Sequence, residues 1–135
     1  MSEKRHVLVA DDDEDQLSML KTVLEDWGHE VTTATGGAEV LKLADERSYS
    51  LVLMDVGMGA RWDGLDILSK LRAGDGPSSR VPIVIISGYT SERHKADAVK
   101  RGACGYIEKP VDLDELRIVL DRNLGGKGSG GAPLP

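Results

Sequence analysis

Carboxylates, a hydroxyl and an ammonium stand at the points of this sequence where short apolar runs end. Acidic residues follow the first and third runs, a serine closes the fourth, and a lysine follows the fifth. In chain order the groups are Asp11–Asp15, Asp55, Ser87–Gly88 and Lys109–Pro110. If the runs are parallel strands, their carboxyl ends meet at one edge, where open α/β sheets bind ligands. We therefore expect these side chains to form one site.

The residue types in this set suit the transfer of a phosphoryl group to a carboxylate. Clustered carboxylates repel one another and resist ionisation unless a cation is near. A few oxygen ligands, with room for water and phosphate, favour Mg²⁺ over Ca²⁺. Lys109 supplies a positive charge for the phosphoryl group, Ser87 supplies a hydrogen-bond donor, and Gly88 leaves the approach open. Asp55 is the best candidate nucleophile, because it stands alone at the end of an apolar run.

Each of these groups has an ordinary explanation when it is taken alone. An acidic run is usually solvated surface or the start of a helix, and we expect Asp13 and Glu14 to have that role. A single Asp after a strand is more often a cap or turn residue, and Ser-Gly is more often a turn. The prediction therefore depends on all of them occurring at strand ends in the right order.

The elements that must position these groups alternate along the chain. Five strand-like runs are expected, at His6–Ala10, Val31–Ala34, Leu51–Met54, Pro82–Ser87 and Cys104–Glu108. The runs VLVA and IVII are apolar throughout and rich in β-branched residues, which is typical of central parallel strands covered on both faces. The run VTTA is more polar and is expected at an edge of the sheet.

Five amphipathic segments separate or follow these runs. The first has Leu17, Leu20, Leu24 and Trp27 at helical spacing. The second is marked by Val40, Leu41 and Ala44 and the third by Leu65, Leu68 and Leu71, and the last two are expected at Ser91–Arg101 and Asp112–Leu120. Possible start signals are Thr35 for the second helix and the pair Asp112 and Glu115, which has the spacing of a capping box, for the fifth. Glycines are expected just past helix ends, at Gly28, Gly74 and Gly102. The alternation predicts a doubly wound α/β fold with right-handed crossovers.

Length, charge and composition limit the function classes. The 135 residues allow one domain, which we place at 1–124, followed by a flexible Gly-rich tail at 125–135. A net charge of −6 argues against direct binding to nucleic acid or to an anionic membrane. Apolar runs of about four residues are too short for a transmembrane helix or a signal peptide. With Cys104 as its single cysteine, the chain cannot form an internal disulfide, and we expect a cytoplasmic protein.

The matching stretches VLVADDDED, LVLMDVGMGARWDGLDIL, PIVIISG and GYIEKP resemble the response regulator receiver domain of two-component signalling, over about residues 5–124. The resemblance implies a flavodoxin-like sheet of five parallel strands in the order 2-1-3-4-5, with five helices. It implies that Asp55 accepts a phosphoryl group from the phosphohistidine of a sensor kinase. It also implies that Mg²⁺ is bound by the side chains of Asp12 and Asp55, by the carbonyl of Gly57, and by Asp11 through water.

The resemblance gives the remaining site residues a role in switching. It implies that Ser87 donates a hydrogen bond to the phosphoryl group and that Lys109 pairs with it. The Lys109–Pro110 peptide is usually cis in such domains. Tyr106 matches the aromatic residue whose inward or outward rotamer reports the state of Ser87. The phosphoryl group then shifts the population between an inactive and an active form.

This sequence departs from the family pattern around the loop after the third strand. Met58-Gly59 replaces the common Met-Pro, and one added residue places the Asp63-Gly64 turn eight residues after Asp55 instead of seven. Ser87 replaces the more frequent threonine and keeps the hydroxyl. We expect the loop geometry to be affected but not the nucleophile.

The expected partners are a sensor histidine kinase or phosphotransfer protein and an unidentified output protein. The output protein would bind a face formed by the fourth helix, fifth strand and fifth helix. Its candidate residues are Arg93, His94, Lys95, Tyr106 and Leu113–Arg117. A homodimer stays open. The hydrophilic start MSEKRH favours a natural N-terminus, and the chain is either a stand-alone protein or one domain of a longer one.

Two alternatives remain. One is an interaction module of the same fold that is not phosphorylated. The other is a Mg²⁺-dependent phosphotransferase or phosphatase that turns over through an aspartyl phosphate, because fold alone does not fix function. A chain of this size leaves no room for a cap or substrate pocket, and such an enzyme would be expected to carry its nucleophile on the first strand, so we expect a switch and not an enzyme.

Overall fold

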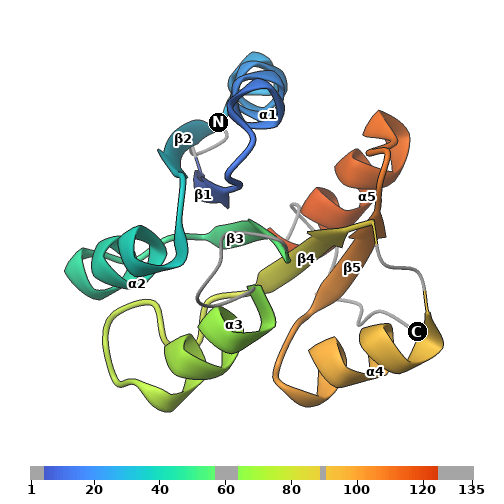
Figure 1. Cartoon of the computed structure of the whole chain (residues 1–135). Coiled ribbons are helices and arrows are strands. Elements are labelled where there is room, and N and C mark those ends of the chain that lie inside the picture. Colours follow the sequence, from blue (N-terminus) through green and yellow to red (C-terminus); the bar gives the residue numbers. More distant parts are fainter. Residues whose placement is uncertain (1–4, 57–63, 89–90, 125–135) are drawn as a thin grey trace.

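A computed structural model describes residues 5–56, 64–88 and 91–124 of the chain. These residues form five strands and five helices in strict alternation (Figure 1). The strands are β1 (His6–Ala10), β2 (Glu30–Ala34), β3 (Leu51–Asp55), β4 (Ile83–Ser87) and β5 (Gly105–Glu108). The helices are α1 (Glu14–Asp26), α2 (Gly37–Glu46), α3 (Gly64–Ala73), α4 (Glu92–Lys100) and α5 (Leu113–Asn123).

The strands form one parallel sheet in the order β2-β1-β3-β4-β5. This confirms the predicted fold class and strand order, with the polar β2 at an edge. The strand bounds differ from the predicted ones by one residue at most. The register brings the site strands together, because Ala10 pairs with Met54, Asp55 with Ile86, and Ser87 with Glu108.

Two helical layers cover the sheet. Helices α1 and α5 lie on one face and α2, α3 and α4 on the other (Figure 1). The side chains of each strand alternate between these layers, as the period of two along a strand requires. In β1, Val7 and Val9 pack with α1 and α5, whereas Leu8 and Ala10 pack in the opposite core. Every residue of β3 and β4 is buried, so these two strands are the rigid centre on which the site is built.

Side-chain caps and glycines set several helix ends. Asp13 caps α1 by accepting hydrogen bonds from the N–H groups of Asp15 and Gln16, at 2.9 and 3.3 Å, which confirms its predicted role. Asp112 caps α5 in the same way. Gly28 and Gly102 have φ values of +97° and +111° just past α1 and α4, where a side chain would be strained.

The predicted cap of α2 is wrong. Gly36, and not Thr35, is the N-cap residue of this helix. Thr35 lies one residue too early, and its N–H donates to the carboxylate of Glu39 at 2.9 Å. As the N-cap residue, Thr35 would have accepted a hydrogen bond from an N–H of the first turn of α2. Instead, Thr35 is a donor, and the Glu39 carboxylate accepts from its N–H.

Some predictions concern residues outside the described ranges. These are the flexible tail at 125–135, the metal-binding carbonyl of Gly57, and the altered loop positions Met58, Gly59 and Asp63. In the part of the chain that is described, no helix has the length and apolar character needed to cross a bilayer.

Candidate functional site

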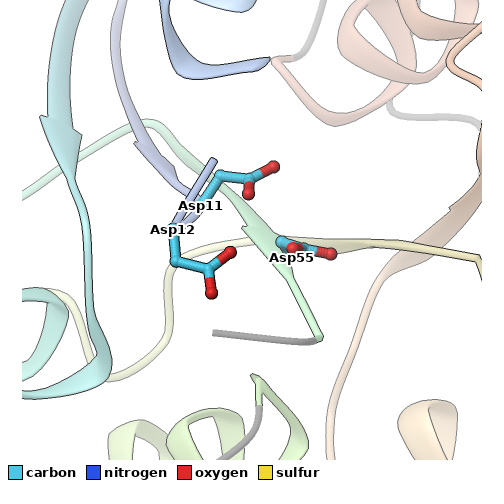
Figure 2. A group of neighbouring side chains, drawn as sticks. All are labelled: Asp11, Asp12 and Asp55. Atoms are coloured by element: carbon cyan, nitrogen blue, oxygen red, sulfur yellow. The ribbon is translucent and has the colours of Figure 1, made fainter. Parts of the chain in front are cut away.

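Three carboxylates meet at the carboxyl edge of the sheet. Asp11 and Asp12 follow β1, Asp55 ends β3, and one oxygen from each lies within 4.8 Å of the others. Figure 2 shows the three side chains grouped at these strand ends. Asp11 and Asp55 are only 1% and 6% exposed, whereas Asp12 faces solvent. The predicted acidic cluster is therefore present, with one solvent-facing carboxylate and two buried ones.

Backbone hydrogen bonds fix the positions of the two buried aspartates. The Asp11 N–H donates to the Ala34 carbonyl on β2 at 3.1 Å, which prolongs the β1–β2 pairing past the strand end. The N–H of Val56 donates to the Ile86 carbonyl on β4 at 3.1 Å and holds the chain just after Asp55. Each carboxylate is thus attached to a strand end that is itself tied to a neighbouring strand.

Asp11 is held in an electrostatically unfavourable position. Its Oδ1 accepts the N–H of Asp13 at 2.9 Å, but its buried Oδ2 accepts no hydrogen bond within the described residues. Burial above all, together with the neighbouring Asp55 charge, raises the pKa of Asp11 to about 6, against the opposing effects of the Asp13 N–H and Lys109. A cation at this edge would relieve that cost.

Lys109 is the counter-charge within the site. Its Nζ lies 3.2 Å from Oδ1 of Asp55 and 3.9 Å from Oδ2 of Asp11. The N–H of Lys109 donates to the Ser87 carbonyl at 2.8 Å, so the β4–β5 pairing carries the lysine to the site. The Lys109–Pro110 peptide is cis, as the resemblance implied.

Ser87, Gly88 and Tyr106 lie beside this pair. Ser87 ends β4 with 1% of its surface exposed, one position beyond the residue that pairs with Asp55. Gly88 is exposed, and a side chain there would meet nothing within 4 Å, in agreement with an open approach. Tyr106 is half-buried against the core of the α2–α4 layer. Its ring packs edge-on against the His94 ring, with the two ring centroids 6.3 Å apart.

Two features of the site were not predicted. Gly64, noted in the sequence only as a turn residue, packs directly on the backbone of Asp55 and Val56. Lys95 of α4 forms an ion pair with Glu108, the residue before Lys109. The Asp-Gly pair could have indicated the close approach of Gly64, but nothing in the local sequence pairs Lys95 with Glu108.

The donor set fits a divalent cation. Three carboxylate oxygens within 4.8 Å of one another, one of them solvent-facing, offer hard oxygen ligands and leave space for water. Oδ2 of Asp11 accepts no hydrogen bond within the described residues and has only a long ion pair there, 3.9 Å from Nζ of Lys109, which is a second sign that this edge suits a cation. Asp11, Asp12 and Asp55 are therefore the described residues that could hold a metal ion.

Comparisons with known proteins agree with this geometry. The family model of the response regulator receiver domain matches residues 7–121. The transcriptional regulatory protein ZraR of Escherichia coli O157:H7 is 36% identical over 118 residues, which is 87% of this chain and 26% of that protein. The chain thus spans about a quarter of the length of this relative.

Solved structures show the same fold. The receiver domain of a Francisella response regulator has a TM-score of 0.83 at 32% identity, covering 90% of this chain and 98% of that one. A response regulator from Burkholderia pseudomallei, solved with a phosphorylated aspartic acid, calcium and citrate, has a TM-score of 0.78 at 29% identity, covering 90% and 69%. On its fold, its acidic edge and the match over residues 7–121, the chain belongs to the response regulator receiver domain family of two-component signalling.

Proposed function

We propose that Asp55 accepts a phosphoryl group from the phosphohistidine of a sensor histidine kinase or phosphotransfer protein. The proposal is supported mainly by the groups around the Asp55 carboxylate. Nζ of Lys109 lies 3.2 Å from its Oδ1, and one oxygen each of Asp11 and Asp12 lies within 4.8 Å of an Asp55 oxygen. A buried carboxylate with a positive group on one side and a cation-binding set on the other is suited to act as a nucleophile toward a phosphoryl group.

The transfer step follows from these contacts. An oxygen of Asp55 forms the new bond to phosphorus while the phosphorus–nitrogen bond of the phosphohistidine breaks, and its electron pair stays on the imidazole nitrogen. Lys109, now 3.2 Å from the carboxylate, pairs with a phosphoryl oxygen. The Ser87 hydroxyl donates to another phosphoryl oxygen. The buried strand ends hold the nucleophile in place and keep its orientation fixed.

The acidic residues would hold Mg²⁺ next to the nucleophile. Asp11, Asp12 and Asp55 are the described candidates, and the carbonyl of Gly57 remains a proposed ligand. When bound, the ion would neutralise negative charge on the transferring phosphoryl group. Without it, the Asp55 charge would face two further carboxylates, and among the described residues Lys109 is the cation that offsets them.

The proposed output is a change of partner binding. Receiver domains are not a classical enzyme family, and we propose one phosphoryl group per chain and no repeated turnover on a substrate. The proposed face comprises α4, β5 and α5, where His94 contacts Tyr106 and Lys95 pairs with Glu108. Phosphorylation would shift Ser87, Gly88 and Tyr106, and with them this face.

We also propose domain bounds, a cellular location and a molecular setting for this chain. We take residues 1–124 as the receiver domain and 125–135 as a flexible tail, working in the cytoplasm, as is usual for response regulators. Transcriptional regulation is a property of the relative ZraR as a whole, of which this chain matches 26%. A regulator with an output domain is therefore a proposed setting for this chain.

The test is phosphorylation by acetyl phosphate and Mg²⁺, followed by intact mass. The wild-type chain should gain one phosphoryl group, and Asp55→Asn should gain none. Asp13→Asn is a matched control, because it alters a neighbouring carboxylate that caps α1 and should leave labelling unchanged. Absence of labelling in the wild type, or equal labelling of Asp55→Asn, would contradict the proposal.

A further inference from the structure

Gly64 packs directly on the backbone at the end of the strand that carries the nucleophile. It is the first residue of α3, and its N–H donates to the Val56 carbonyl at 2.6 Å. A Cβ at this position would lie 2.6 Å from the carbonyl oxygen of Asp55 and 2.8 Å from Cα of Val56. Both contacts are with backbone, so no side-chain rotation could relieve them.

Both sides of this contact are fixed by the rest of the fold. Helix α3 buries Leu65, Ile67, Leu68 and Leu71, so it cannot move outward without opening the core. On the strand side, Val56 is hydrogen-bonded to Ile86 of β4. A Cβ on Gly64 needs the separation to grow from 2.6 Å to at least 3.0 Å, and part of that shift must fall on Asp55.

The same contact bears on the added residue in the β3–α3 connection. Val56 and Gly64 are the two ends of this connection, and the 2.6 Å hydrogen bond joins them directly. An extra residue between two joined ends can be accommodated without moving either end, since loop-closure entropy changes little with loop length. The position of Asp55 then depends on the Gly64 contact and not on the number of residues in the connection.

We propose that Gly64 is a positioning residue for phosphoryl transfer: the absence of a side chain there lets α3 seat on the backbone of Asp55 and Val56 and so sets the Asp55 carboxylate against Lys109 and Asp11. The proposal rests on the function proposed above for Asp55. It predicts that a single added methyl group at Gly64 impairs the site, whereas a core truncation that leaves this contact in place does not.

The experiment measures Asp55 phosphorylation over a range of acetyl phosphate concentrations, by intact mass and per folded molecule. The variants are Gly64→Ala and Val40→Ala, a truncation in the core of the α2–α4 layer that lowers stability. Near-UV circular dichroism gives the folded fraction. A Mg²⁺ titration followed by amide chemical shifts gives a second measure that does not depend on phosphorylation.

Gly64→Ala should lower the maximal rate by roughly tenfold or more, because displacements well below 1 Å already misalign reacting groups. Its Mg²⁺ affinity should also fall. Val40→Ala should keep the wild-type rate per folded molecule within roughly threefold, because it leaves the contact of Gly64 with Asp55 and Val56 in place. Should Gly64→Ala be largely unfolded, the measurements are repeated in trimethylamine N-oxide, which favours the folded state, and a wild-type rate per folded molecule there would overturn the proposal.

Two further results would overturn the inference while leaving the phosphoacceptor proposal intact. One is a Gly64→Ala chain whose rate and Mg²⁺ affinity per folded molecule equal those of the wild type. The other is an equal loss of rate in Val40→Ala, which would make the effect one of general stability. An unlabelled wild-type chain would instead refute the proposed function, and the Mg²⁺ titration would then decide whether Gly64 positions the site.

Discussion

Replacing Asp11 by asparagine should stabilise the metal-free protein at neutral pH. The Asp11 carboxylate is 1% exposed, and burial and the Asp55 charge raise its pKa from 3.8 to about 6. Asparagine has nearly the same shape, and its carbonyl oxygen can keep the hydrogen bond from the Asp13 N–H. The substitution therefore removes a charge that the folded state disfavours, with little change in packing.

The size of the effect follows from the pKa. A raised pKa means that the folded state binds the proton more tightly than the unfolded state, so stability falls as the pH rises from about 4 through 6. A difference of about two pKa units corresponds to about 3 kcal/mol above pH 7. Loss of the attraction to Lys109, whose Nζ is 3.9 Å away, reduces the net gain. We expect about 1–3 kcal/mol, or a Tm about 3–10 °C higher.

The assay is urea and thermal unfolding of the wild type, Asp11→Asn and the control Asp13→Asn, in EDTA, at pH 7.5 and pH 5.0. The advantage of Asp11→Asn should be present at pH 7.5 and shrink at pH 5.0, where Asp11 of the wild type is mostly protonated in the folded state. Mg²⁺ should stabilise the wild type and narrow the difference. The reasoning is refuted if Asp11→Asn is no more stable than the wild type at pH 7.5, or if its advantage does not depend on pH.

Three other changes should have distinct effects. Lys109→Gln should slow phosphorylation of Asp55 by acetyl phosphate by roughly 10- to 100-fold, because the counter-charge at 3.2 Å is lost; a time course by intact mass checks this. Arg72→Met should lower the free energy of unfolding by about 2 kcal/mol in urea titrations, since the guanidinium donates to the Gly102 carbonyl at 2.8 and 3.3 Å. Burial lowers the pKa of His29, so protonation of this imidazole should cost the folded state stability as the pH falls below about 6.5; the free energy of unfolding of His29→Gln relative to the wild type, from urea titrations, should therefore increase between pH 7 and pH 5.

The sequence was sufficient to predict the fold and the meeting of the acidic residues. Parallel strands all run in one direction, so groups that follow β1 and β3 must reach the same edge when those strands are neighbours. The apolar runs and the polar edge strand then limited the order of the sheet. Asp11, Asp55 and Lys109 could be brought together by this argument, because each is attached to a strand end.

What could not be predicted depends on distances between elements that the local sequence does not encode. The ion pair of Lys95 with Glu108 requires α4 to lie at a particular height over β5. The N-cap of α2 was predicted one residue too early: Thr35 donates its N–H to Glu39 in the first turn of the helix, and Gly36 is the N-cap residue. The close contact of Gly64 with Asp55 depends on how deeply α3 packs into the core. Propensity and spacing describe single elements and carry no such information.

Burial of Asp11 and Asp55 makes their charged forms unfavourable, and for the same reason it favours binding of a cation. In water, three carboxylates would each be solvated and would have little need of a cation. Here two of them are almost fully buried, one of their oxygens accepts no hydrogen bond within the described residues, and Lys109 is the only cation the described residues place beside them. Binding of a divalent ion would recover the free energy that burial of these carboxylates costs, so burial would favour the metal-bound state. Any substitution that stabilises the pocket by removing a carboxylate must therefore weaken metal binding.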